Sequence, residues 1–102
     1  MKSQAVEVVI FSVPRKNKML TLSFFASIRE TIGRGGNEME LPESVGNVRQ
    51  LVDYLISQEA DALAVLADEG QVLVAVNQTV VDRSHPLNGN EEVAFFPPMT
   101  GG

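Results

Sequence analysis

A single long helical pattern in the middle of this 102-residue chain limits the folds available to it. Ser44, a favoured N-cap residue, precedes a predicted helix over 45–58. Apolar residues recur there at the spacing of one helix face, namely Val45, Val48, Leu51, Val52, Leu55 and Ile56. A lone helix cannot cover its own apolar stripe, so this stripe must pack on a sheet.

Strand patterns flank the helix on both sides. Before it, 20–25 and 38–41 alternate between apolar and polar residues, with Leu20, Leu22 and Phe24 on one face of the first strand. Between these strands we expect a short helix over 27–32, a stop at Gly33 and a flexible turn at Gly35-Gly36. After the long helix we expect a short helix over 60–66, a buried strand over 71–76, a turn at 77–78 and a short strand over 79–81. A second turn is predicted at Asn88-Gly89, because both residues tolerate positive φ, and the last strand covers 92–96.

This order of elements predicts an α+β fold with the β-grasp arrangement of ubiquitin-like proteins over residues 19–96. A mixed sheet of four or five strands would pack on the one main helix. The helix links two hairpin-like halves, so the first and last strands can lie side by side in the centre of the sheet.

Residues 1–18 differ from the rest of the chain. They contain all three lysines, Lys2, Lys16 and Lys18, and have a net charge of +3, whereas the whole chain carries −5. Two interpretations remain open. In one, Met19 is the natural start and the preceding residues are upstream or added sequence; in the other, 7–13 forms an extra strand.

Composition excludes several classes of function. The chain has no cysteine and one histidine, His85, so thiolate chemistry and a multi-histidine metal site are excluded, and we expect no bound metal or cofactor. The acidic body argues against nucleic-acid binding. No apolar stretch approaches a membrane span, and no signal peptide is recognisable, which predicts a cytoplasmic protein.

No internal group of residues indicates an enzyme site. His85 follows Ser84 directly, which is poor geometry for a nucleophile and its base, so we interpret it as a loop histidine. The carboxylate pairs Glu38/Glu40 and Glu91/Glu92 are interpreted as structural, with the first pair on a solvated strand face. We therefore expect no catalysis by this chain alone.

The C-terminal end is the candidate site. Pro97-Pro98 ends the last strand and favours an extended tail over 97–102. Gly101 and Gly102 lack Cβ atoms and can enter a narrow channel of a partner. The terminal carboxylate is ionised at neutral pH and unreactive until another enzyme activates it.

Residues 19–102 resemble the MoaD family, the small subunit of molybdopterin synthase. The shared features are 24–26 with 28–30, 75–78, 85–87 and, most specifically, Glu92-Val93-Ala94-Phe95-Phe96-Pro97-Pro98-Met99-Thr100-Gly101-Gly102. The family usually has a small branched residue in place of Met99, and 1–18 lies outside the resemblance.

The resemblance implies a sulfur carrier. A MoeB-type enzyme would use ATP to adenylate Gly102, and a sulfur donor protein would convert the adenylate into a thiocarboxylate. The tail would then enter a MoaE-type large subunit, which supplies the catalytic residues, and would give its sulfur to the pterin precursor of molybdopterin. Such synthases are heterotetramers.

The residues predict a docking surface for such partners. Gly101, Thr100, Met99, Pro98 and Pro97 would bind as the tail, with Phe96 and Phe25 as exposed aromatic contacts. The alternative is that 1–18 or a loop covers one or both phenylalanines. The absence of lysine from 19–102 is either compositional bias or a protection of the activated terminus against self-acylation.

Three other functions remain open. A ubiquitin-like protein modifier would use the same activated terminus. A thiamin-pathway carrier of the ThiS kind is a second possibility, although such chains are typically shorter. A plain β-grasp interaction module, from another class, would have an inert terminus and would tolerate loss of Gly102.

Overall fold

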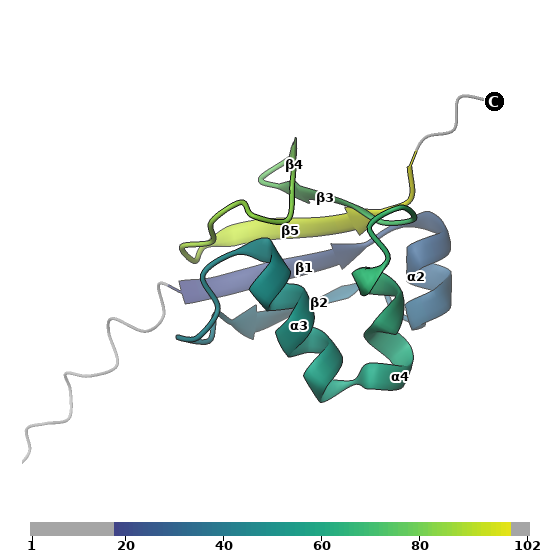
Figure 1. Cartoon of the computed structure of the whole chain (residues 1–102), viewed down its shortest axis with the longest axis horizontal. Helices are drawn as coiled ribbons and strands as arrows, with labels where there is room; N and C mark the ends of the chain where they lie inside the picture. The colour runs from purple at the N-terminus through teal and green to yellow at the C-terminus, as the bar shows by residue number, and fades with distance from the viewer. Residues whose placement is uncertain (1–17, 99–102) are drawn as a thin grey trace, which may run out of the picture.

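The computed structural model describes residues 18–98, which form a five-stranded sheet and its covering helices (Figure 1). The strands are β1 (Met19–Phe24), β2 (Gly36–Glu40), β3 (Leu73–Val76), β4 (Thr79–Val81) and β5 (Glu91–Phe96). The helices are α2 (Ala26–Ile32), α3 (Val48–Gln58) and α4 (Ala60–Leu63), which continues into the 3-10 turn η3 (Ala64–Ala67).

The sheet has the strand order β2-β1-β5-β3-β4. β1 and β5 lie side by side in its centre and run parallel, with Leu22 opposite Val93, while the other neighbouring pairs are antiparallel. The predicted mixed β-grasp sheet is thus confirmed, with five strands. Because β1 and β5 are parallel, the start of β1, which follows Lys18, and the end of β5, which precedes Pro97 and Pro98, lie at opposite ends of the sheet. Figure 1 shows the two strands running in the same direction.

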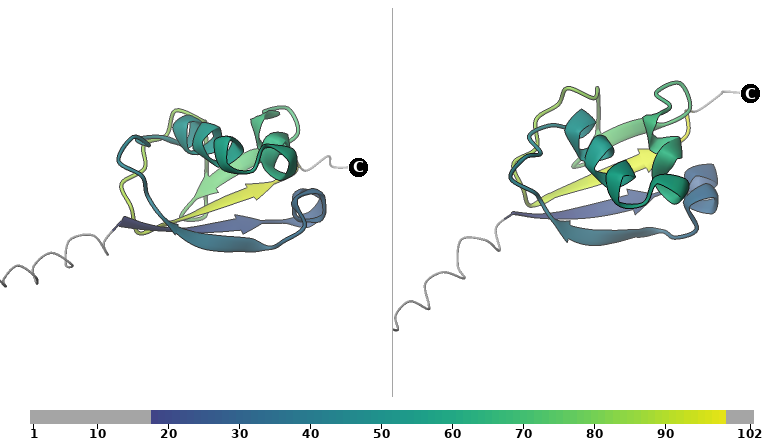
Figure 2. Two further views of the ribbon diagram at one scale, coloured as in Figure 1. Left: turned by 90° about the horizontal axis from the view of Figure 1, so that it is seen from below. Right: turned by 60° about the horizontal axis from the view of Figure 1, so that its bottom comes forward.

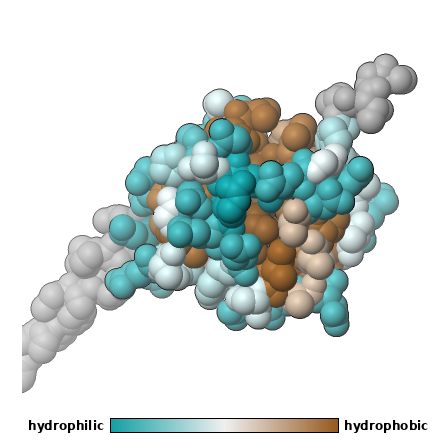
Figure 3. Space-filling view, in the orientation of Figure 1, coloured by the Kyte–Doolittle hydropathy of each residue, from teal (hydrophilic) through white to brown (hydrophobic). Residues whose placement is uncertain are grey.

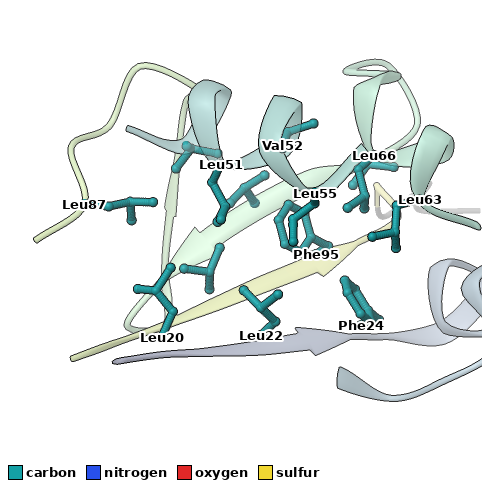
Figure 4. Close-up of a cluster of buried hydrophobic side chains, with 14 of the residues drawn as sticks. Leu20, Leu22, Phe24, Leu51, Val52, Leu55, Leu63, Leu66, Leu87 and Phe95 are labelled. Atoms are coloured by element: carbon teal, nitrogen blue, oxygen red, sulfur yellow. The ribbon is translucent and has the colours of Figure 1, made fainter. Parts of the chain in front are cut away.

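The core lies between the sheet and the helices (Figure 4). Leu20, Leu22 and Phe24 are at most 2% exposed, as the alternation in the sequence predicted. The rings of Phe24 and Phe95 pack with their centroids 5.8 Å apart. The helical side contributes the fully or nearly fully buried residues Val48, Leu51, Val52, Leu55, Leu63 and Leu66.

The long helix begins three residues later than the sequence predicted. Ser44 is not its N-cap: Asn47 has the extended cap conformation, and its side chain accepts a hydrogen bond from the Gln50 N–H at 2.8 Å. Val45 is buried but lies before the helix, where its N–H donates to the Pro42 carbonyl in a turn. The apolar pattern extended beyond the helix because it records burial rather than conformation.

Two glycine-containing turns also differ from the predictions. In the turn before β5 the positive φ angles fall on Gly89 (101°) and Asn90 (61°), not on Asn88. Gly36 is the first residue of β2 rather than part of a flexible turn. Its φ is 143°, and a Cβ there would lie 2.1 Å from the Leu22 carbonyl oxygen, so the pairing of β1 with β2 requires a glycine.

The two faces of the sheet are covered differently. α3 and α4 lie over one face and α2 lies at the end of the sheet, so the described elements leave the opposite face open (Figure 2). On the helical side, hydrophilic residues cover much of the surface, and apolar residues gather around the lower part of the α3–α4 pair and near β4 (Figure 3). The open face is the one that carries the candidate site.

Candidate functional site

The end of β5 is held from both sides. Phe96 is opposite Leu73 of β3, and the Phe25 N–H donates to the Phe95 carbonyl at 3.0 Å. Pro97 and Pro98 follow and cannot donate to a strand ladder, so the paired strand ends at Phe96. The chain therefore leaves the sheet from its central strand, beside α2 (Figure 1). Met99, Thr100, Gly101 and Gly102, the remaining predicted site residues, lie outside the described residues, as does the predicted strand over 7–13.

Two aromatic side chains turn away from the core at this end of the sheet. Phe25 has an extended backbone and follows the buried Phe24, so alternation places it on the opposite side, where it is 48% exposed. Phe95 is fully buried, and its neighbour Phe96 is only half-buried. The sequence predicted that Phe25 and one of Phe95 and Phe96 point outward, while a docking role for Phe25 and Phe96 remains a prediction.

The register extends these two residues into a larger apolar surface. Phe96 lies opposite Leu73, Ala94 lies opposite Ala75, and Ala75 lies opposite Val80, which is 62% exposed. We call the six residues together the outward patch: Phe25, Leu73, Ala75, Val80, Ala94 and Phe96. Within it, Ala75 is only 7% exposed. Leu73, Ala75, Val80 and Ala94 were not identified as site residues from the sequence. Strand alternation from Phe96 would have found Ala94, whereas the other three depend on the register between strands. Exposed apolar side chains gathered on a sheet face are a common feature of protein-binding surfaces.

Ala26 carries backbone strain beside the outward patch. Its φ is 52°, in the left-handed region that costs a non-glycine residue about 1–2 kcal/mol. The residue directly follows Phe25 and opens α2, so this conformation turns the chain from strand into helix immediately after the exposed ring. The strained residue is thus the one at which the extended backbone of β1 and Phe25 ends.

The polar residues considered in the sequence have structural partners. The Ser84 hydroxyl and N–H both donate to the Asp82 carboxylate, and these hydrogen bonds lower the pKa of Asp82 from its ordinary value. Ser84 is thus not paired with His85, whose carbonyl instead accepts from the Val48 N–H at 3.0 Å. Glu91 accepts hydrogen bonds from the Asn88 and Gly89 N–H groups, so its carboxylate is held in the turn.

Glu38 and Glu40 are exposed on β2, as predicted. Within residues 18–98, no group of three or more histidine, cysteine, aspartate or glutamate side chains could hold a metal ion. None of the helices in this range is both long enough and apolar enough to cross a membrane. The features of the described part that suit a function are the exit of the tail and the outward patch beside it.

A β-grasp domain with an exposed apolar sheet face and a tail leaving the central strand is the architecture of ubiquitin-like carrier proteins. The family model described as "ThiS family" matches residues 22–102. The chain is also 40% identical over 84 residues to the molybdopterin synthase sulfur carrier subunit of Escherichia coli (strain K12), covering 82% of this chain and 100% of that protein. The chain belongs to the ThiS family.

Further comparisons agree with this assignment. The sulfur carrier subunit of Haemophilus influenzae is 36% identical over 84 residues, 82% of this chain and all of that protein. A solved structure of a putative molybdopterin converting factor, subunit 1, from Pyrococcus furiosus superposes with a TM-score of 0.62 at 27% identity, covering 79% of this chain and 98% of that one. A complex of subunits 1 and 2 of the molybdopterin-converting factor from Helicobacter pylori shares the fold, with a TM-score of 0.56 at 20% identity over 82% of this chain and 99% of that one.

Proposed function

We propose that this chain is the sulfur carrier subunit of a molybdopterin synthase. The observation that carries the proposal is the 40% identity to a protein of that name over that protein's entire length. The family match supports the proposal because the matched residues extend to Gly102, the residue on which a carrier would load sulfur. The proposed carrier atom is the carbonyl carbon of Gly102.

The proposed loading has three steps. An activating enzyme of the MoeB type joins the Gly102 carboxylate to the AMP part of ATP and releases pyrophosphate. The terminal sulfur of a persulfide on a donor protein then displaces AMP and forms an acyl disulfide. A thiol finally attacks the donor's own cysteine sulfur, forms a disulfide with it and releases the thiocarboxylate. Each loaded chain carries one sulfur, so a dithiolene, with its two sulfur atoms, consumes two loaded chains.

The outward patch and the tail have separate tasks in this proposal. The patch is apolar and lies directly beside the exit of the tail, so a partner that binds the patch also fixes where the tail begins. Pro97 and Pro98 restrict the first residues of the tail, which lowers the entropy lost when it enters a partner. Burial of Phe25 and Phe96 would supply the anchoring contacts of the interface.

The proposed large subunit, of the MoaE type, supplies the catalytic side chains. Ser84 and Glu91 are each engaged in hydrogen bonds with neighbouring loop residues, which supports this division of tasks. The proposed assembly is a hetero-oligomer in which this chain presents sulfur and the partner positions the pterin precursor. The complex of the two Helicobacter pylori subunits supports such a partnership.

The intact mass of the chain tests the proposal. The purified chain would be incubated with ATP, a MoeB-type enzyme and a persulfide donor, next to a control variant lacking Gly102. We expect one oxygen to be replaced by one sulfur at Gly102 in the full chain and no change in the control. The activating enzyme is first shown to load its own carrier protein. An unchanged mass of this chain with that enzyme would contradict the proposal and favour an inert interaction module. Isopeptide-linked target proteins in place of the thiocarboxylate would favour a protein modifier.

A further inference from the structure

All three lysines of this chain precede Met19 in the sequence. They are Lys2, Lys16 and Lys18, and no lysine occurs from Met19 to Gly102. Lys18, the one lysine among the described residues, is exposed and directly precedes β1. Its carbonyl accepts a hydrogen bond from the Leu41 N–H at 2.7 Å, which fixes it beside the last residues of β2.

The parallel pairing of β1 and β5 separates Lys18 from the tail. Leu20 is opposite Glu91 and Phe24 is opposite Phe95, so Lys18 precedes the start of β1 while the tail leaves after the end of β5. A strand of six residues, the length of β1, spans about 20 Å. The six residues from Pro97 to Gly102 reach at most about 20 Å. The tail would therefore have to fold back along the whole sheet to approach Lys18.

The positive charges near the tail belong to arginines. The Arg29 N–H donates to the Phe25 carbonyl at 3.2 Å, which places Arg29 one helical turn from the exposed ring. Arg34 follows α2 and forms an ion pair with Glu59 at 2.9 Å. A guanidinium remains protonated in proteins and has no free nitrogen lone pair for attack on an acyl group, whereas a lysine amine does when it loses its proton. Positive charge at this end is thus supplied without a nucleophile.

We propose that the absence of lysine from residues 19–102 protects an activated Gly102 from capture by an amine of its own domain. This inference rests on the proposed function, because it needs an adenylated terminus. The reaction avoided is attack of a lysine Nζ on the Gly102 carbonyl carbon of the adenylate. The C–N bond forms, the C–O bond to AMP breaks, AMP leaves with the electron pair, and the proton of the amine passes to water. The product is an isopeptide that can no longer carry sulfur.

Gln71 is the position best suited to test this. It is exposed and lies two residues before Leu73, which is opposite Phe96, so it precedes β3 at the end of the sheet where the tail leaves. Ser44 is a matched control, since it is also exposed and polar but lies three residues after Leu41, at the Lys18 end of the sheet. Gln71→Lys and Ser44→Lys therefore add the same charge and the same amine at opposite ends.

The experiment uses the full chain with ATP and the activating enzyme, without a sulfur donor, so that the adenylate meets only water and amines. We expect Gln71→Lys to accumulate a chain that is one water lighter and cross-linked at residue 71, at least about tenfold faster than Ser44→Lys or the unsubstituted chain. Equal yields in the two variants, with pyrophosphate released in both, would overturn the proposal. Absence of pyrophosphate release from the unsubstituted chain would instead overturn the proposed function.

A second variant removes the added charge as an explanation. Arg29→Lys keeps the charge next to the tail and changes only the chemistry of the group. We expect it to form the same type of internal isopeptide, while Arg49→Lys, on α3, does not. Products in Arg49→Lys equal to those in Arg29→Lys would overturn the proposal, because self-acylation would then be independent of position. Circular dichroism of each variant would confirm that the fold is retained.

Discussion

Phe95 and Phe96 are neighbours in β5 and belong to opposite faces of the same sheet. Phe95 is fully buried against Phe24 and the helices, whereas Phe96 lies half-buried on the open face next to Leu73. On the helical face each side chain is fixed by packing, so its identity affects the stability of the fold. On the open face a side chain is free to contact a partner, so its identity should affect binding with little effect on stability.

Replacement of the two phenylalanines gives the largest expected effect and tests this comparison directly. Phe95→Ala should lower the free energy of unfolding by about 3–5 kcal/mol, because it leaves a cavity in a packed core. Phe96→Ala should cost less than about 1.5 kcal/mol but should weaken binding of the large subunit at least tenfold. Urea denaturation and titration calorimetry would measure the two quantities. Equal losses of stability in both variants would refute the division between the faces.

Arg83 gives the next largest effect and is the buried charge among the described residues. It is 7% exposed, and its guanidinium donates to the carbonyls of Leu66 at 2.7 Å and Val72 at 2.9 Å; burial lowers its pKa from the ordinary value. Arg83→Met should destabilise the fold by about 2–3 kcal/mol, because two buried carbonyls lose their partner. The exposed Arg49, paired with Glu69 at 3.4 Å, is the matched control, and Arg49→Met should cost less than about 1 kcal/mol. Similar midpoints of thermal unfolding for the two variants would contradict this role.

The cap of α3 should give a smaller effect on the helical side. Asn47→Ala removes the acceptor for the Gln50 N–H and should cost about 1 kcal/mol of unfolding free energy. Ser44→Ala is the control, because the sequence predicted Ser44 as the cap and the structure places it outside the helix. Denaturant titration should show a shift in the midpoint for Asn47→Ala alone. A shift of the same size for Ser44→Ala would show that the helix begins earlier.

The smallest expected effect lies beside the outward patch and has the opposite sign. Ala26→Gly relieves a left-handed φ of 52° and should stabilise the fold by about 0.5–1 kcal/mol, after the entropic cost of glycine is included. Ser27→Gly, the next residue in α2, should destabilise it instead, since no strain is relieved there. Chemical denaturation of both variants would measure the difference. Destabilisation by Ala26→Gly would mean that the strain at this residue is negligible.

The elements with a repeating pattern could be predicted from the sequence. Alternation placed Leu20, Leu22 and Phe24 in the core and turned Phe25 outward, and the helical spacing found the face of α3. The order of strands and helices was sufficient to predict the β-grasp sheet with β1 and β5 in its centre. For the buried faces the signal is local, because neighbouring residues of one element reveal which of them are buried. The sheet followed from the order of the elements along the chain.

Features that depend on distant residues could not be predicted. The carbonyl partners of Arg83 lie 11 and 17 residues away, and nothing near Arg83 in the sequence indicates that it is buried. Val80 joins the outward patch only because the register places it opposite Ala75. The helix start was misplaced because Val45 is as well buried as a helix residue while lying outside the helix. The apolar pattern revealed that Val45 is buried, but it did not reveal that Val45 lies in a turn closed by the Pro42 carbonyl.

The parallel pairing of β1 and β5 also has a practical consequence for handling the protein. Because Lys18 and Pro98 lie at opposite ends of the sheet, a purification tag or fluorescent domain fused before residue 1 is attached through the end away from the outward patch. A single residue added after Gly102 would instead occupy the position of the terminal carboxylate. The N-terminal side is therefore the side for labels, immobilisation and fusion in every experiment that requires a working tail.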